Sequence, residues 1–256
     1  MENIFETHAH YDDMQFDEDR EILLEELPKQ GVCGVITAGA DLKSSVAAVE
    51  LAEKYPYIHS AVGVHPENIT ETLEPNFVQE LENLINNHKK IVAVGEIGLD
   101  YHFRQDNKEL QKEVFIKQLE LANKHNLPVL VHDREAHGDT MEILKKFTPK
   151  GIVHCFSGSV EMAREVVKLG MYLGVGGVVT FKNAKNIVEV VREMPLEVMV
   201  LETDAPYMAP VPFRGKRCDS SMIKYTAEKI AEIKNIDAQK VCDITKSNAI
   251  KLFGIK

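Results

Sequence analysis

The chain has 256 residues, 44% of them hydrophobic, which is enough for one large core or two small domains. Its formal net charge of −10 argues against a protein that coats nucleic acid with a broad basic surface. No run approaches the roughly 18 to 20 apolar residues of a membrane span, and no basic, then apolar, N-terminal segment predicts a signal peptide. Four scattered cysteines without a C-x-x-C pair favour a reduced, cytoplasmic protein. We expect no membrane partner.

Short apolar runs alternate with amphipathic segments along the whole chain. In chain order, the expected strands are Ile4–His8, Val32–Ala38, Ile58–His65, Ile91–Glu96, Val129–His132, Ile152–Cys155, Tyr172–Gly176 and Val198–Glu202. The expected helices are Asp17–Lys29, Leu42–Lys54, Glu74–His88, Asp106–His125, Thr140–Phe147, Val160–Leu169, Asn183–Arg192, Met222–Lys234 and Ala238–Phe253. Most of the strands are continuous in Val, Ile, Leu and Ala, as parallel strands buried on both faces are.

Eight strand-and-helix units in about 250 residues predict an α/β protein with the (β/α)8 TIM barrel fold. A doubly wound open sheet is the alternative. No low-complexity linker or shift in composition divides the chain, so we expect one domain over residues 1–256. Asp106 and Glu109 have the spacing of a capping box at the start of their helix.

Imidazoles and carboxylates collect at the ends of the expected strands. His8 and His10 end the first strand, with His65, Glu96, His132 and His154 at the third to sixth and Glu202 and Asp204 at the eighth. In a parallel barrel these ends converge on one face. Each residue alone is readily explained as a hydrogen-bonded or solvated loop residue. Together they would repel and desolvate one another unless a cation paired them.

The candidate metal ligands are His8, His10, Glu96, His132, His154 and Asp204. Four histidines and two carboxylates are too many for one tetrahedral zinc ion with an open position, and they suit two divalent ions that share a carboxylate. Mixed nitrogen and oxygen donors favour Zn, Mn, Co, Ni or Fe over Ca, and Mg fits less well because of the nitrogen ligands unless water completes its ligand shell.

These motifs, in this order, resemble the TatD family of metal-dependent hydrolases. The matching segments are Thr7-His8-Ala9-His10, Gly63-Val64-His65-Pro66, Gly95-Glu96-Ile97-Gly98-Leu99-Asp100, Val131-His132, His154-Cys155-Phe156-Ser157-Gly158, Glu202-Thr203-Asp204-Ala205-Pro206-Tyr207 and Arg214-Gly215-Lys216-Arg217. The resemblance implies an amidohydrolase-like TIM barrel with magnesium-dependent deoxyribonuclease activity. It also implies one metal ion on His8, His10 and Asp204, a second on His132 and His154, and Glu96 as the bridge. The family continues Asn-Glu-Pro where this chain has Cys218-Asp219-Ser220, so the loop that frames the substrate is altered.

The expected reaction is attack of a metal-activated water on a DNA phosphodiester, at single-stranded ends. Asp204 would also accept a proton, and Glu202 would support the ligands. His65 would contact the phosphate or leaving group, or would orient a ligand. Arg104, Arg134, Arg214, Lys216 and Arg217 are the candidate phosphate contacts. Tyr101, Phe103, Phe156, Tyr207 and Phe213 are the aromatic side chains expected near the site, for base stacking or for packing.

Two other functions fit the same residues. The dinuclear site could hydrolyse an amide, a lactone or a different ester, or the chain could be a non-enzymatic metal-binding interaction protein. No coiled-coil heptads are present, so we expect a monomer.

Overall fold

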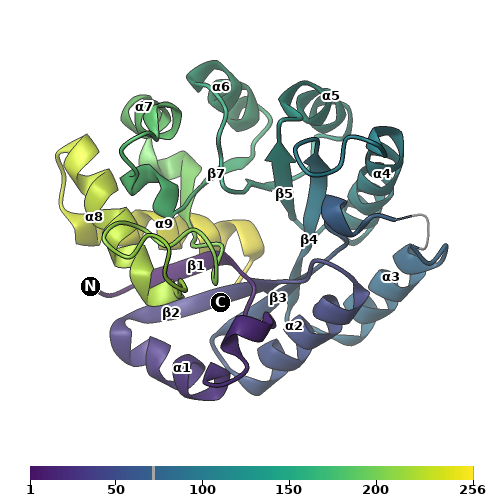
Figure 1. The fold of residues 1–256 in the computed structure, drawn as a ribbon, viewed down its shortest axis with the longest axis horizontal. Helices are drawn as coiled ribbons and strands as arrows, with labels where there is room; N and C mark the ends of the chain where they lie inside the picture. The colour runs from purple at the N-terminus through teal and green to yellow at the C-terminus, as the bar shows by residue number, and fades with distance from the viewer. Residues whose placement is uncertain (71–72, 256) are drawn as a thin grey trace.

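The computed structural model describes residues 1–70 and 73–255, and its eight strands form one parallel sheet in the order β1 to β8 (Figure 1). The strands are β1 (Ile4–Ala9), β2 (Val32–Ala38), β3 (Ile58–Val62), β4 (Ile91–Asp100), β5 (Val129–Arg134), β6 (Gly151–Val153), β7 (Tyr172–Val175) and β8 (Met199–Leu201). Just after β8, Ala205 forms an isolated parallel bridge with Ala9, which nearly closes the sheet into a barrel. The predicted TIM barrel is therefore confirmed, and the open doubly wound sheet is excluded.

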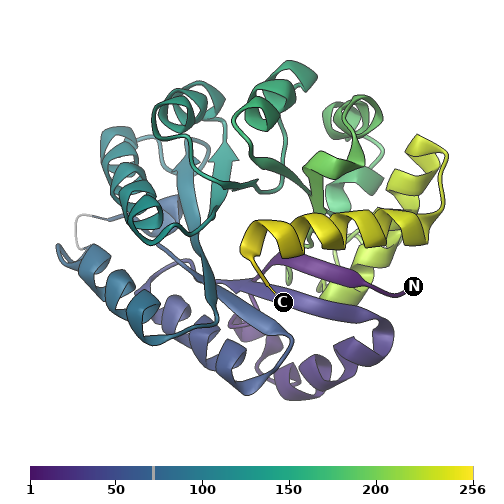
Figure 2. The same cartoon turned by 180° about the vertical axis from the view of Figure 1, so that it is seen from behind.

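Helices surround the strands on the outside of the barrel (Figures 1 and 2). They are α1 (Arg20–Glu26), α2 (Leu42–Lys54), α3 (Phe77–Asn87), α4 (Lys108–His125), α5 (His137–Phe147), α6 (Val160–Lys168), α7 (Lys185–Glu193), α8 (Ile223–Lys234) and α9 (Ala238–Phe253). The last helix, α9, packs against α8, β1 and β8 near the point of closure (Figure 2). In the described ranges, none of these helices combines the length and apolarity that crossing a bilayer requires.

Several predicted boundaries differ from the structure for local reasons. The helix expected over Asp17–Lys29 is α-helical only to Glu26 and continues as a 3-10 helix over Leu27–Gln30, because Pro28 has no N–H to donate. The predicted capping box is wrong. Asp106 pairs with Arg104 at 3.2 Å, and no side chain caps the amino-terminal end of α4.

Two other differences bear directly on the strand ends. Strand β4 extends four residues past its predicted end, so Glu96 lies inside the strand. Strand β3 ends at Val62, and His65 is in the following loop, where its ring caps a short 3-10 helix. Beside β5, Gly98 has a φ of +147°, and a Cβ there would lie 2.0 Å from the His132 carbonyl oxygen. Glycine at position 98 thus lets the two strands that carry Glu96 and His132 approach closely.

Strands β1 and β4 are buried along their whole length, although both contain ionisable residues. Glu6 and His8 of β1 are fully buried, and Glu96 of β4 is 4% exposed. Buried ionisable groups are costly unless they are paired or neutralised. The polar residues of these strands therefore indicate a functional site inside an otherwise apolar barrel.

Candidate metal centre

Four donor atoms from three segments meet at the carboxyl-terminal end of the barrel. Nε2 of His8 and Nε2 of His10 lie 3.2 Å apart, at the end of β1. Asp204, in the loop after β8, places Oδ1 3.8 Å from the first of these nitrogens and 3.4 Å from the second. Glu96 Oε2 lies 3.3 and 3.4 Å from the same two nitrogens. The structure thus brings together the three residues that the family resemblance assigns to one ion, with Glu96 beside them.

The other oxygen of Glu96 faces a second group of imidazoles. Oε1 lies 2.9 Å from His132 Nδ1, 2.9 Å from His154 Nε2 and 3.4 Å from His65 Nε2. The Glu96 carboxylate therefore stands between two groups of donors, one on each oxygen. A bridging ligand requires this arrangement.

Hydrogen bonds on the far side of two rings fix which nitrogen carries the proton. His10 Nδ1 is 2.9 Å from the Ala38 carbonyl oxygen, and His132 Nε2 is 2.9 Å from Asp100 Oδ2. Both oxygens only accept, so each of these nitrogens is a donor. When these rings are neutral, the nitrogens that face the site, His10 Nε2 and His132 Nδ1, carry the lone pairs that metal ligands need.

His65 has the opposite arrangement. Its Nδ1 accepts a hydrogen bond from the backbone N–H of Glu67 at 3.2 Å, so the proton of the neutral ring is on Nε2. That nitrogen faces Glu96 and the site as a donor. We assign His65 to hydrogen bonding in the site rather than to metal ligation.

The donor set fits divalent ions. Ligand atoms that share an ion at about 2.0 to 2.1 Å lie roughly 3.0 to 3.4 Å apart, close to the spacings around His8 and His10. At most one proton can lie between the two Nε2 atoms, and a cation would satisfy both of them and both carboxylates. Burial also lowers the pKa of His8 to about 4, which favours the neutral ring that a ligand needs. Burial acts on His10, His132 and His154 too, but neighbouring carboxylates outweigh it and raise the pKa of these rings, so a bound ion would have to displace their extra protons.

A buried carboxylate that the sequence analysis did not single out holds β1 to the loop after β8. Glu6 Oε1 accepts the backbone N–H groups of His8 and Thr203 at 3.0 and 2.9 Å. Glu6 Oε2 accepts the hydroxyl groups of Thr203 and Ser220 at 2.6 and 3.0 Å. Burial raises the pKa of Glu6 to about 8. Its place directly after the apolar Ile4 and Phe5 and two residues before His8 was the only signal in the sequence.

Ser220, in the segment 218–220 that differs from the family pattern, belongs to the hydrogen bonds around Glu6. Ser220 donates to Glu6, and its backbone N–H donates to the hydroxyl of Tyr11 at 3.0 Å. A proline at this position would supply neither donor. In the structure the altered loop therefore contacts the support of β1, and the six candidate ligands are all in place.

Asp100 supports the other half of the site. Besides His132, it accepts the backbone N–H groups of His102 and Phe103 at 2.9 and 2.8 Å. Burial alone would raise the pKa of Asp100, but these hydrogen bonds outweigh that effect and lower it to about 2. The carboxylate stays ionised near neutral pH and can only accept. The sequence analysis quoted Asp100 in a motif and gave it no role.

Glu202 lies behind His154, as a supporting residue would. Its Oε1 accepts the backbone N–H of Cys155 and is 3.7 Å from His154 Nδ1. Burial raises the pKa of Glu202 to about 7. A Cβ on Gly174 would lie 2.4 Å from Glu202 Oε2, so only glycine leaves room for this carboxylate.

Some of the candidate phosphate contacts already pair with a carboxylate, and others do not. Arg217 makes a two-pronged ion pair with Asp19 at 2.6 and 2.7 Å, and Arg104 pairs with Asp106. Within residues 1–70 and 73–255, Arg134, Arg214 and Lys216 have no carboxylate partner. A committed guanidinium has fewer donors to offer, so Arg217 and Arg104 are weaker candidates than the sequence indicated.

Three of the five aromatic candidates pack inside the protein, and two are exposed. Tyr101 and Phe156 are buried, and Phe213 packs against Tyr225, so these three serve packing. Phe103 and Tyr207 are 56% and 48% exposed.

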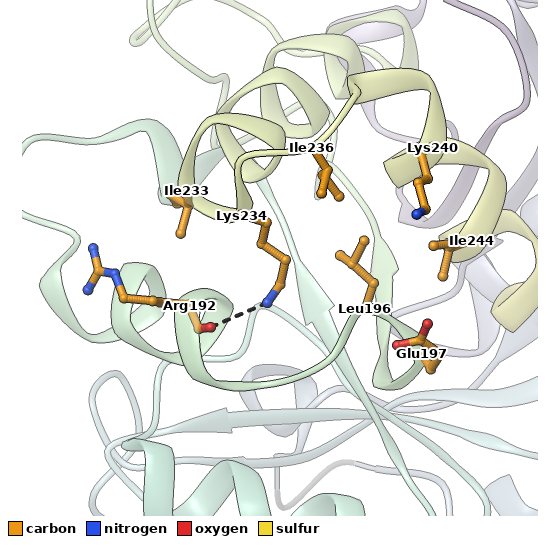
Figure 3. A pocket seen from close by; sticks show the side chains of 8 residues that line it. All are labelled: Arg192, Leu196, Glu197, Ile233, Lys234, Ile236, Lys240 and Ile244. Atoms are coloured by element: carbon orange, nitrogen blue, oxygen red, sulfur yellow. Dashed lines mark hydrogen bonds between the residues drawn. The ribbon is translucent and has the colours of Figure 1, made fainter.

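A hollow of about 320 Å³ lies away from the candidate ligands, where the ends of α7 and α8 meet the start of α9 (Figure 3). Leu196 and Ile236 form part of its wall, and Lys234 donates to the Arg192 carbonyl oxygen at 3.3 Å (Figure 3). It lies at the amino-terminal end of β8, opposite to Asp204, and none of the predicted site residues lines it.

Comparisons with known proteins match over nearly the whole chain. Residues 5–254 match the family model described as TatD related DNase. The chain is 43% identical to the uncharacterized metal-dependent hydrolase YabD of Bacillus subtilis over 255 residues, which cover 98% of this chain and 99% of the relative. YJJV, a TatD homologue from Escherichia coli K12, has a similar structure with a TM-score of 0.93 at 31% identity, covering 99% of both chains. A TatD family hydrolase from Entamoeba histolytica has a TM-score of 0.88 at 25% identity, covering 98% of both.

Proposed function

The chain belongs to the TatD-related DNase family, which confirms the resemblance and makes it a metal-dependent hydrolase, and we propose that its substrate is the phosphodiester bond of DNA. The observation that carries the proposal is the position of Glu96. Each of its carboxylate oxygens faces a separate group of imidazoles, as a site for two neighbouring ions requires. We propose that His8, His10 and Asp204 hold one ion, that His132 and His154 hold the other, and that Glu96 bridges them.

When bound, two divalent ions supply the acidity that ionises a water molecule and the charge that neutralises a phosphate. Mg, Mn and Zn are the candidate ions. Asp204 is the best placed proton acceptor, because its side chain is 21% exposed and that of Glu96 only 5%. A proton accepted by Asp204 can therefore pass to solvent. The Nε2–H of His65 is directed into the site and would donate to a phosphate oxygen or to the leaving group.

The free cations support a phosphate substrate over a neutral one. Arg134 ends β5, two residues after His132, so the alternation of a strand puts both side chains on the same side. Arg214 and Lys216 lie in the loop after β8 that also contains Asp204. Guanidinium groups without carboxylate partners suit phosphate. Because the net charge of the protein is −10, most of its surface would repel DNA, so DNA would bind only at the cations around the mouth of the barrel. A single-stranded end fits such a restricted site better than a long duplex does.

The test is cleavage of single-stranded DNA labelled at the 5′ or the 3′ end. Metal-stripped protein would be compared with protein reloaded with Mg, Mn or Zn, and Glu96→Ala would be the matched variant. Shortening from one end that requires metal and is lost in the variant would support an exonuclease and give its polarity. Ile22→Ala, a change at an exposed residue of α1, is the control.

Other outcomes would replace this proposal. Two bound ions and much faster hydrolysis of amides, lactones or other esters would assign the same site to another substrate. Binding of nucleic acid or a protein partner without any turnover would favour the non-enzymatic alternative.

We also propose a cytoplasmic monomer. All four cysteines are free in the structure, which supports a reducing compartment. Sedimentation of the metal-loaded protein would test the monomer, and a dimer at low micromolar concentration would overturn it.

A further inference from the structure

Some exposed apolar side chains lie on the loops that follow strands β4 and β8. In the described residues, the large exposed ones are Met1, Met14, Ile22, Val46, Phe103, Tyr207, Met208 and Val211. Four of these eight lie after β4 or β8, the strands that carry Glu96 and precede Asp204. Single exposed apolar residues need no explanation, so a role for any one of them has to be argued from the groups that surround it.

Phe103 is the most exposed aromatic residue of this group, and its turn is firmly held. Asp100 accepts the backbone N–H groups of His102 and Phe103 through one oxygen. His102 Nδ1 is 2.8 Å from a carboxylate oxygen of Glu135, and the Tyr101 N–H donates to the Arg134 carbonyl oxygen at 2.9 Å. The ring is therefore presented to solvent from an anchored turn rather than from a loose loop.

The same turn is tied to a candidate metal ligand. Asp100 accepts from His132 Nε2 through its other oxygen, at 2.9 Å. One carboxylate thus fixes both the turn that carries Phe103 and the imidazole of His132. A group stacked on Phe103 would be held in a constant position relative to the metal centre.

Arg134 completes the arrangement. Its guanidinium carbon lies 4.5 Å from the centre of the Phe103 ring, and the His102 ring meets Phe103 edge-on at 4.8 Å. No carboxylate in the described part of the chain pairs with Arg134. The guanidinium therefore covers one face of the Phe103 ring, and the ring, which is 56% exposed, can offer its other face to a base. This π surface and a cation without a carboxylate partner together match the base and the phosphate of a nucleotide. A small amide or lactone presents neither of these groups.

We propose that Phe103 and Arg134 form a nucleotide subsite, in which the base of a single strand stacks on Phe103 and the adjoining phosphate contacts Arg134. The inference rests on the proposed function, because it places the base beside the phosphate to be cleaved. It goes further by assigning the base recognition to one ring and by requiring an unpaired base. A duplex end would have to be opened before it could bind.

The test follows binding and cleavage separately. Binding is measured in an Asp204→Asn background with short single strands that carry 2-aminopurine at the 5′ or the 3′ end, because stacking quenches this fluorescent base. Matched strands with an abasic terminal position report the phosphate contacts alone. Phe103→Ala is compared with Phe103→Leu, which keeps the apolar bulk, and with Phe103→Tyr, which keeps the flat ring. Ile22→Ala removes a 67% exposed apolar side chain elsewhere.

We expect Phe103→Ala and Phe103→Leu to lose the quenching and to bind the base-bearing strand about tenfold more weakly. Neither should change binding of the abasic strand, and both Phe103→Tyr and Ile22→Ala should behave as the parent protein does. Unchanged quenching in Phe103→Ala, or equal weakening with both strands, would overturn the subsite.

Cleavage with Asp204 intact separates the two proposals. Quenching that depends on Phe103 without any cleavage would leave the subsite standing and remove the nuclease proposal. Metal-dependent cleavage with a KM unchanged by Phe103→Ala would leave the nuclease standing and remove the subsite.

Discussion

Replacing Asp100 with asparagine would test whether one hydrogen bond sets the ligand form of His132. Asp100 Oδ1 accepts the N–H groups of His102 and Phe103, and Oδ2 accepts from His132 Nε2. Asparagine retains one oxygen for the two N–H groups, so its NH2 group faces Nε2 and that nitrogen becomes an acceptor. The imidazole proton moves to Nδ1, which then has no lone pair for a metal ion.

The size of the effect follows from this change of tautomer. Loss of a group that orients a ligand typically weakens metal binding about 10- to 100-fold, or about 1.4 to 2.7 kcal/mol. Only the ion that we propose for His132 should be affected, because the candidate ligands at the end of β1 have other supports. Asp100→Ala should cost about 2 to 4 kcal/mol of folding stability as well, because two backbone N–H groups lose their acceptor.

The assay is competition with a chromophoric chelator, using Zn or Mn, together with denaturant unfolding of each variant. Asp139→Asn is the matched control, since Asp139 accepts from Tyr101 and pairs with Lys112 outside the metal centre. We expect one of two binding equivalents to weaken in Asp100→Asn and both to stay unchanged in the control. Two equivalents of parental affinity in Asp100→Asn would refute the reasoning.

Asp204→Asn should abolish turnover and leave the unfolding midpoint within a few degrees of the parent, and any substantial remaining activity would contradict its assignment. Glu6→Ala should cost about 3 to 5 kcal/mol in urea unfolding, because four hydrogen bonds lose their partner, and Glu6→Gln, which can both donate and accept, should cost less. Since burial raises the pKa of Glu6 to about 8, the wild type should lose stability as the pH rises from 5 to 8, a loss that Glu6→Gln should not share. Arg134→Gln should weaken binding of base-bearing and abasic strands alike, and it should reduce the salt dependence of binding by about one phosphate contact. Arg164→Gln, which removes a guanidinium that pairs with Glu193, is the control and should change neither quantity. Lys90→Met should cost about 2 to 4 kcal/mol in the same urea assay, because the three N–H donors of its ammonium are shared among four carbonyl oxygens, and a loss below 0.5 kcal/mol would contradict that role.

Local patterns predicted most of the fold. Continuous apolar runs indicated buried parallel strands, and their regular recurrence indicated the barrel. The predicted boundaries are wrong at the ends of some elements, where a single residue or contact decides where the element ends. Pro28 converts the end of a helix to 3-10 geometry, and the pairing of Asp106 with Arg104 replaces the expected cap.

The candidate ligands were recognisable because a ligand's place in the barrel follows from its place in the chain. Residues at the carboxyl ends of the strands face the same mouth, so His8, Glu96 and Asp204 could be grouped from the expected strand ends, although β4 runs four residues past Glu96. The position of a supporting residue in the chain does not predict which residues it will contact. Glu6 acts on residues 197 and 214 positions away, and no spacing in the sequence predicts those partners.

The sequence by itself determined the barrel, the type of site and the six candidate ligands, because periodicity and strand order are local properties. The tertiary structure decided which nitrogen of each ring faces the site and which cations are free. In the sequence, Arg217 and Arg134 are equally good candidates for a phosphate contact. In the structure, Arg217 pairs with Asp19, 198 residues away, whereas Arg134 lies over Phe103 and has no carboxylate partner among the described residues. Hydrogen bonds and ion pairs between distant segments depend on distances of a few ångströms, which only the folded chain sets.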